Sequence, residues 1–236
     1  LEARTAQALP MTFGIEGVAT AAGGSVALWS AEGEILSVAS DRTITRLKLP
    51  DSIRPAGVAI VPEGFLILDR YSGREFRLGV DSVLRPTGNG SAIAEGEKLD
   101  QAIRQEGIWA LALREAFSHE FRVRRQGATL FRSAPGATVK ATPRYFVSPD
   151  HGSLLLTHVT APFELIRVAP TGRADTLAGS LDSALASIIP PDSLPNWRAL
   201  PAVTIDCGLL LTLSDLTADR RLLVRVNAEG QVVRVT

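Results

Sequence analysis

The stretch Gly64-Phe-Leu-Ile-Leu-Asp-Arg-Tyr-Ser-Gly-Arg-Glu-Phe-Arg-Leu78 decides the fold of this chain. A glycine opens an apolar run, the residues Tyr71-Ser72-Gly73 form a polar break, and a second run alternates charged and apolar side chains. Short apolar runs bounded by turn residues are typical of β-strands that pair as a hairpin. The stretch therefore predicts two antiparallel strands, Phe65–Leu68 and Glu75–Leu78.

The same pattern recurs around four other glycines, Gly24, Gly107, Gly152 and Gly208, and the five glycines are spaced by 40, 43, 45 and 56 residues. A period in the forties with two hairpins per unit is typical of a four-stranded propeller blade. The sequence thus predicts an all-β fold, a β-propeller in which five repeats are visible, either five-bladed or five blades of six. Each glycine is expected in the tight turn between the inner strand and the second strand, where a positive φ is needed.

We expect one propeller domain over residues 1–236, with two segments that depart from the repeat. Residues 110–121 have helix propensity. We nevertheless favour two strands there, because the residues at both ends of this segment align with the repeat pattern of the other units. Residues 178–200 are predicted to be a helical or loop insertion, with a helix over Ser180–Ile189 that Pro190 ends. In a five-bladed chain, Leu1–Phe13 is expected to supply an extra outer strand.

The unit Gly64–Leu78 resembles a repeat of the six-bladed propeller superfamily that includes NHL-repeat, SMP-30/gluconolactonase, strictosidine synthase-like and TolB-like proteins. The resemblance implies the fold and a bacterial, often exported, context. SMP-30-like enzymes hold a divalent metal with a Glu, two Asn and an Asp. Here Asn89, Asn196 and Asn227 fall in expected loops and a strand-end turn, so no metal set is matched. We predict no cofactor, and the sequence gives a divalent metal no support.

The composition narrows the classes of partner. Twenty-five basic residues balance 25 acidic residues without forming a basic stripe, which argues against nucleic acid. The longest apolar runs, such as Leu154–Leu156, fall far short of the roughly 20 residues of a membrane span. The single Cys207 excludes an internal disulfide and is expected to be a buried, inert thiol. The start at Leu1 rather than Met indicates a processed or trimmed chain. Because the family resemblance implies an often exported context, we expect a periplasmic or secreted location after removal of a signal, with the cytoplasm left open.

Candidate binding residues follow the second strand of each unit, because the loops of successive blades gather there on one face of a propeller. Together with an aromatic residue of the insertion, they are Asp69, Arg70, Arg114, Glu115, His158, Asp215 and Trp197. Acid, base and imidazole groups at one face could transfer protons or bind a polar ligand. The alternative, which we favour, is that the two aspartates accept hydrogen bonds within their own turns and that the tryptophan packs in the core.

Two classes of function stay open. We favour a non-catalytic propeller that binds a protein, a peptide or a small ligand on its loop face, because no unit carries a complete catalytic set. The alternative is an enzyme of the SMP-30 or strictosidine synthase kind, a lactonase, hydrolase or lyase with its site at the channel mouth. The sequence has no GxSxG nucleophile motif and assigns no catalytic residue.

Overall fold

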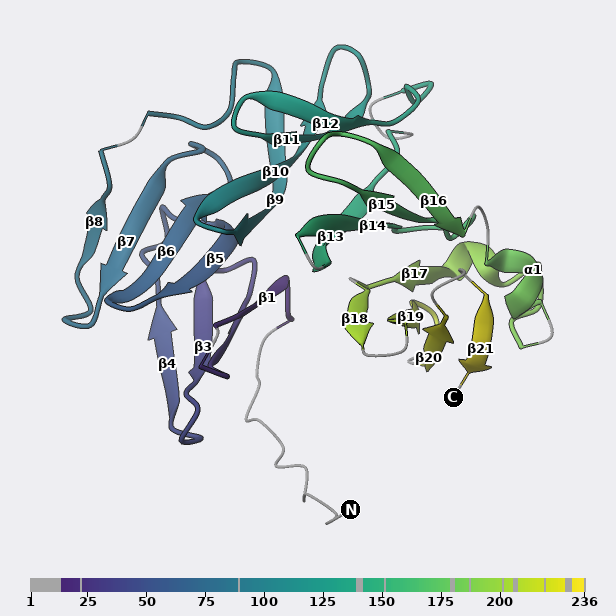
Figure 1. The fold of residues 1–236 in the computed structure, drawn as a ribbon, viewed down its shortest axis with the longest axis horizontal. Helices are drawn as coiled ribbons and strands as arrows, with labels where there is room; N and C mark the ends of the chain where they lie inside the picture. Colours follow the sequence, from purple (N-terminus) through teal and green to yellow (C-terminus); the bar gives the residue numbers. More distant parts are fainter. Residues whose placement is uncertain are drawn as a thin grey trace. The chain divides into compact units, whose positions relative to one another are not determined.

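The computed structural model describes residues 14–235 except 22, 89, 139–141, 151, 179–180, 187, 201, 206–207, 219 and 228–230. In this part the strands form five antiparallel sheets, each with a path of four neighbouring strands (Figure 1). The predicted all-β propeller of four-stranded blades is confirmed, with five blades. The chain divides into two compact units. The first holds blades one and two, and the second holds blades three to five together with the turn residues 70–73.

The first unit contains eight strands. Blade one consists of β1 (Gly17–Thr20), β2 (Val26–Trp29), β3 (Glu34–Val38) and β4 (Ile44–Lys48), and blade two of β5 (Pro55–Val61), β6 (Gly64–Asp69), β7 (Glu75–Gly79) and β8 (Leu84–Pro86). Their facing sides share a core built around Trp29, Ile35 and Ile67. A Cβ atom on Gly17 would lie 2.1 Å from the Trp29 side chain, so the inner strand must be glycine there to admit the indole.

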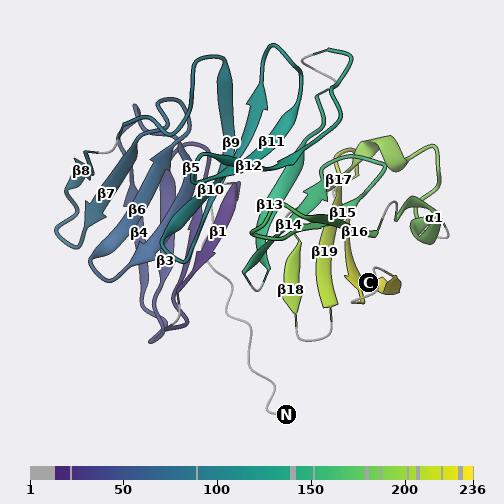
Figure 2. The ribbon, with the colours of Figure 1, turned by 45° about the horizontal axis from the view of Figure 1, so that its top comes forward.

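The second unit contains three blades (Figure 2). Blade three consists of β9 (Glu97–Gln105), β10 (Ile108–Glu115), β11 (Phe121–Arg125) and β12 (Ala128–Arg132), and blade four of β13 (Tyr145–Asp150), β14 (Ser153–His158), β15 (Leu165–Val168) and β16 (Ala174–Ala178). Blade five consists of β17 (Trp197–Ala199), β18 (Val203–Ile205), β19 (Gly208–Asp215), β20 (Arg221–Val226) and β21 (Val232–Val235).

Two cores hold these three blades together because the side chains of each strand alternate between its faces. Leu156 of β14 joins Phe121 and Val123 in the core shared with blade three. The preceding residue, Leu155, joins Phe163 in the core shared with blade five. The central blade therefore buries both of its faces.

The five repeat glycines all have the predicted positive φ, with values of +81°, +128°, +80°, +86° and +130° at Gly24, Gly64, Gly107, Gly152 and Gly208. Two of them are also confined by the neighbouring strand. A Cβ atom would lie 2.2 Å from the Leu78 carbonyl oxygen at Gly64 and 2.1 Å from the Val226 carbonyl oxygen at Gly208. At Gly24 and Gly152 nothing lies within 4 Å of that position. The glycine thus serves the turn in every blade and close packing in two.

Of the two segments predicted to depart from the repeat, the structure confirms the prediction for the first and differs from it for the second. Residues 110–121 form β10, a turn and the first residue of β11, as predicted. Instead of a helix over 180–189, the structure has the four-residue α1 (Asp182–Leu185), followed later by the 3₁₀ turn η2 (Leu194–Asn196). Leu181, Leu185 and Ile189 of this segment are all buried in the core between blades four and five. Ser180, Cys207, His151 and Leu1–Phe13 lie outside the described residues. No helix of the described part is long and apolar enough to cross a membrane.

Candidate functional site

The turn between the second and third strands closes in the same way in all five blades. At the end of the second strand a backbone N–H donates to a carbonyl at the start of the third, over N···O distances of 2.9–3.1 Å. The pairs are Ser30 with Glu34, Asp69 with Arg74, Glu115 with Glu120, His158 with Glu164, and Asp215 with Arg220. The shared bond makes the first residues of these pairs equivalent, so Glu115 rather than Arg114 corresponds to Asp69.

The side chains at this position bond within their own blades. The Ser30 hydroxyl oxygen accepts hydrogen bonds from the N–H groups of Glu32 and Glu34 at 3.1 and 3.2 Å. Asp69 is buried and accepts a bond from the N–H of Arg54 at 2.8 Å. The next predicted residue, Arg70, is half-buried in the turn. This arrangement supports the interpretation in which the polar side chain stabilises a loop.

Asp215 shows this role most fully. One carboxylate oxygen accepts bonds from the N–H and the hydroxyl of Thr217 at 2.8 and 2.7 Å. The other accepts two bonds from the Arg220 guanidinium at 3.1 and 2.6 Å. The hydrogen bonds from Thr217 and Arg220 lower the pKa of Asp215 from 3.8 to about 2. Asp215 is therefore a structural carboxylate that stays charged.

Trp197 lies directly opposite Asp215 in the pairing of β17 with β19. Its side chain is only 3% exposed and belongs to the core between blades four and five. The Arg220 guanidinium lies 5.5 Å from the centroid of its ring. The structure therefore places Trp197 in the core and not at an exposed position where it could contact a ligand.

We predict that the Asp215→Asn variant loses part of the pH dependence of stability. A folded-state pKa of about 2, below the ordinary 3.8, stabilises the folded state above about pH 4. This contribution is lost as the pH falls through about 4 towards 2. Thermal unfolding followed by circular dichroism should therefore show a steeper fall of Tm for the wild type than for the variant between about pH 5 and 2. Asp192→Asn, at an exposed carboxylate, should behave as the wild type. Equal slopes for Asp215→Asn and the wild type would contradict the prediction.

Arg114 is engaged by Asp100, a residue that the sequence analysis missed. Its Nη2 donates to one carboxylate oxygen at 2.7 Å, and its Nε donates to the other. The hydrogen bond with Asp100 raises the pKa of Arg114. In β9 the pairing with β10 passes from Leu99 to Gln101, so Asp100 is the extra residue of a β-bulge. Bulges re-aim a side chain, and this one provides the arginine with its partner.

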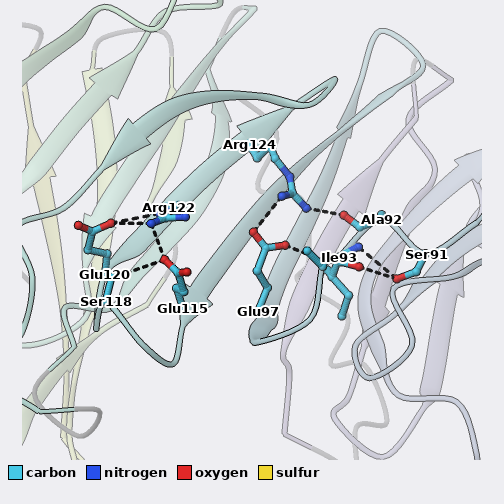
Figure 3. A network of polar contacts seen from close by, with 10 residues as sticks. Ser91, Ala92, Ile93, Glu97, Glu115, Ser118, Glu120, Arg122 and Arg124 are labelled. Atoms are coloured by element: carbon cyan, nitrogen blue, oxygen red, sulfur yellow. Dashed lines mark hydrogen bonds and ion pairs between the residues drawn. The ribbon is translucent and has the colours of Figure 1, made fainter.

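Blade three carries a network of paired charges near the turn between its second and third strands (Figure 3). Arg122 lies between Glu115 and Glu120, forming ion pairs with both. Nearby, Arg124 donates to Glu97 at 2.9 Å. Each of these carboxylates is matched by an arginine of the same blade. The predicted candidate Glu115 therefore holds strands and a turn together.

His158 borders an aromatic cluster between blades three and four. Its ring centroid lies 4.9 Å from that of Tyr145, and its Nδ1 lies 2.9 Å from the carbonyl oxygen of Pro162. Tyr145 also packs against Phe121 and Phe131, at centroid distances of 5.1 and 5.6 Å. Burial, with a further contribution from Glu164, raises the pKa of Tyr145 to about 12. The cluster therefore extends the pH range over which the Tyr145 phenol stays protonated, from about 10 to about 12.

Four predicted residues of the second unit, Arg114, Glu115, His158 and Asp215, are thus bonded within their own blades, while Asp69 belongs to the first unit. Across the described ranges, no group of three His, Cys, Asp or Glu residues could hold a metal ion. The turns instead expose large apolar side chains that the sequence analysis did not single out: Tyr71, Phe117 and Leu216. Each follows an equivalent position, Asp69, Glu115 or Asp215, by one or two residues. That spacing is the signal by which they could have been found.

No protein-family model matches this chain, and no curated protein matches it. Several solved structures are similar to this chain. A nidogen/laminin complex matches with a TM-score of 0.55 at 12% identity, over 94% of this chain and 79% of that one. A gluconolactonase of Xanthomonas campestris matches with a TM-score of 0.53 at 16% identity, over 92% and 74%. A protein of unknown function from Bacteroides thetaiotaomicron matches with a TM-score of 0.53 at 13% identity, over 95% and 59%. At these identities the matches show a shared β-propeller fold, which is the level at which the predicted resemblance holds.

Proposed function

We propose that this chain is a non-catalytic propeller that binds a protein or peptide through the turns between its second and third strands. The observation that carries the proposal is the exposure of large apolar side chains at these turns. Phe117 is 81% exposed in blade three and Leu216 is 64% exposed in blade five. Apolar side chains scattered singly need no explanation, but together with Tyr71 of blade two these recur in the equivalent turns of three blades, one or two residues after the closing position. Burial against a partner removes that apolar surface from water.

The turns that present these side chains are held in place. The N–H of Ala116 donates to the carbonyl of Gly96 at 3.1 Å. The Phe117 side chain lies so close to Gly96 that a Cβ atom there would be 2.7 Å from its ring. In blade five, the N–H of Leu216 donates to the carbonyl of Asn196 at 3.0 Å. A loop that is already ordered loses less conformational entropy on binding, which favours a recognition surface.

An enzyme is the second candidate, and the geometry favours it less. A general acid or base must come within hydrogen-bonding reach of its substrate. Here Arg114 is paired with Asp100, and Glu115 is paired with Arg122. The gluconolactonase that this chain resembles shares the fold, and a shared fold does not carry an activity with it.

We predict that Phe117→Ser and Leu216→Ser each weaken partner binding about tenfold, because each removes exposed apolar area that the partner would bury. Quantitative affinity purification with the full chain as bait, followed by mass spectrometry, identifies the partner, and titration with the purified partner gives the Kd. Both variants should keep the wild-type Tm, since the side chains are exposed.

Val80→Ser provides the matched control, because Val80 is an exposed apolar residue in the other kind of turn, between β7 and β8. It should leave binding unchanged. A partner that binds Phe117→Ser and Leu216→Ser as tightly as the wild type would overturn the proposal. So would turnover of a lactone by the wild type that is lost in Arg114→Gln.

A further inference from the structure

Residues 91–97 form a short loop in the second unit, and a turn with an exposed aromatic side chain is attached to each end of it. At the first end, the N–H of Ala92 donates to the carbonyl of Gly73 at 2.8 Å. A Cβ atom on Gly73 would lie 2.7 Å from the Ile93 side chain, so this turn packs directly against the loop. The turn carries Tyr71, which is 70% exposed and belongs to the same compact unit as the loop.

The other end of the loop holds the turn of blade three in the same way. The N–H of Ala116 donates to the carbonyl of Gly96 at 3.1 Å, and the Phe117 ring packs against Gly96. Tyr71 and Phe117 are therefore presented from the two ends of one loop. Four residue steps separate Ala92 from Gly96, so these attachment points lie at most about 14 Å apart. A few residues of an extended peptide cover that distance.

An ion pair holds the loop in place (Figure 3). Arg124 of β11 donates from Nη1 to the Glu97 carboxylate at 2.9 Å and from Nη2 to the carbonyl oxygen of Ala92 at 2.6 Å. The second oxygen of the Glu97 carboxylate accepts a hydrogen bond from the N–H of Ala94 at 2.8 Å. One arginine thus fixes both parts of the loop at once. The Glu97 side chain is only 9% exposed, so water and salt screen this ion pair less than a surface pair.

We infer that loop 91–97 joins Tyr71 and Phe117 into one binding surface for a peptide segment with two apolar side chains. Arg124 and Glu97 are the positioning residues of this surface. A loop that is fixed before binding loses less conformational entropy, so the ion pair raises the affinity through the loop. Each exposed ring buries one apolar side chain of the segment, and the second contact forms at a high effective concentration once the first has formed. The inference rests on the proposed function, whose partner it specifies.

Amide hydrogen exchange of the full chain, followed by NMR, tests the ion pair without a partner. In the double variant with Arg124→Gln and Glu97→Gln, the N–H groups of Ala92 and Ala116 should exchange about tenfold faster than in the wild type, because the loop opens more often. The N–H of Ser133, bonded to the backbone of β11 at 2.9 Å, should exchange at the wild-type rate. A loss of global stability would accelerate the exchange of Ser133 as well.

The binding surface is tested with a phage library of random twelve-residue peptides that is panned on the full chain. Clones that also bind the double variant with Tyr71→Ser and Phe117→Ser are removed first. The remaining peptides should share two apolar residues at a constant spacing. In fluorescence anisotropy with a labelled copy of the tightest peptide, Tyr71→Ser and Phe117→Ser should each weaken binding about tenfold. Serine in place of either apolar residue of the peptide should have the same effect.

The ion-pair variants are measured with the same peptide. The double variant with Arg124→Gln and Glu97→Gln should weaken binding about fivefold. Arg124→Lys keeps the charge but loses the planar fork, and should weaken binding about twofold. Arg125→Gln is the matched control, because Arg125 is the next residue of β11 and pairs with Glu106 at 3.2 Å. It should leave peptide binding and the exchange of the loop unchanged, whatever its effect on Tm.

The inference is overturned when no clone survives the removal step, or when the surviving peptides depend on Phe117 and bind Tyr71→Ser as tightly as the wild type. Wild-type exchange rates at Ala92 and Ala116 in the ion-pair double variant would overturn the role of Arg124. The proposed function fails separately, when Phe117→Ser and Leu216→Ser leave partner binding intact. If those two variants lose the partner, while Tyr71→Ser and the ion-pair variants keep it, only the joined surface is wrong.

Discussion

Gly208→Ala should lower the free energy of unfolding by roughly 3 kcal/mol or more, because two costs combine at this position. The backbone holds φ at +130°, a conformation that residues with a Cβ atom rarely adopt. The new methyl group would also lie 2.1 Å from the carbonyl oxygen of Val226. The third strand must move away for it to fit, which disturbs the pairing of β19 with β20 and the core beneath. Urea denaturation followed by circular dichroism measures the loss.

Gly152→Ala is the matched control. Gly152 occupies the same turn of blade four with a φ of +86°, but no atom lies within 4 Å of the added methyl group. Only the backbone penalty remains, so this variant should lose about 1 kcal/mol. Similar losses in the two variants would show that the close approach of Val226 does not matter.

Phe121→Ala should cost about 3–5 kcal/mol, the usual range when a large buried ring is deleted. Phe121 is fully buried in the core between blades three and four, and its ring packs 5.1 Å from that of Tyr145. The cavity opens beneath the cluster that supports His158. The m-value should stay constant, since the change affects packing rather than the extent of unfolding.

Phe131→Ala tests whether the loss comes from burial. Phe131 also packs against Tyr145, at 5.6 Å, but it is only partly buried. We expect a loss of roughly 1–2 kcal/mol, because less apolar area leaves water when this ring folds. A loss as large as that of Phe121→Ala would contradict the assignment of the core.

The repeat made the fold predictable because its signals are local. A glycine that must adopt a positive φ and the apolar run that follows it occupy adjacent positions, so Gly64 and Gly208 could be aligned without knowing the structure. The inner strands were harder to predict from the sequence. Blade five splits its inner strand into β17 and β18, and β9 contains a bulge. In the hairpin of β18 and β19, Ile205 lies opposite Gly208. If this register is continued along β19, the residue opposite Asp215 falls within one residue of Trp197, its actual partner. The proline-rich composition of residues 190–201 hid this signal.

The site was less predictable because it depends on partners distant in sequence and on exposure. The sequence singled out Arg114 and Asp215, but not the bulge that turns Asp100 towards the first, nor the packing of Arg220 over Trp197. Phe117 escaped notice because a phenylalanine is expected inside a protein by default. The structure shows that its side chain is exposed in the turn.

The turn closure has a consequence for how each of these turns can change. Three to five residues separate the two partners of the closing hydrogen bond, from Ser30 and Glu34 to His158 and Glu164, while the bond itself is the same. A change of length inside the closure therefore leaves the pairing of the strands below it intact. The residues at the tip of each turn can therefore vary in number and type while the closing hydrogen bond stays the same. One tip can then be exchanged for another. Under the proposed function, partner specificity can then evolve, or be engineered, one blade at a time.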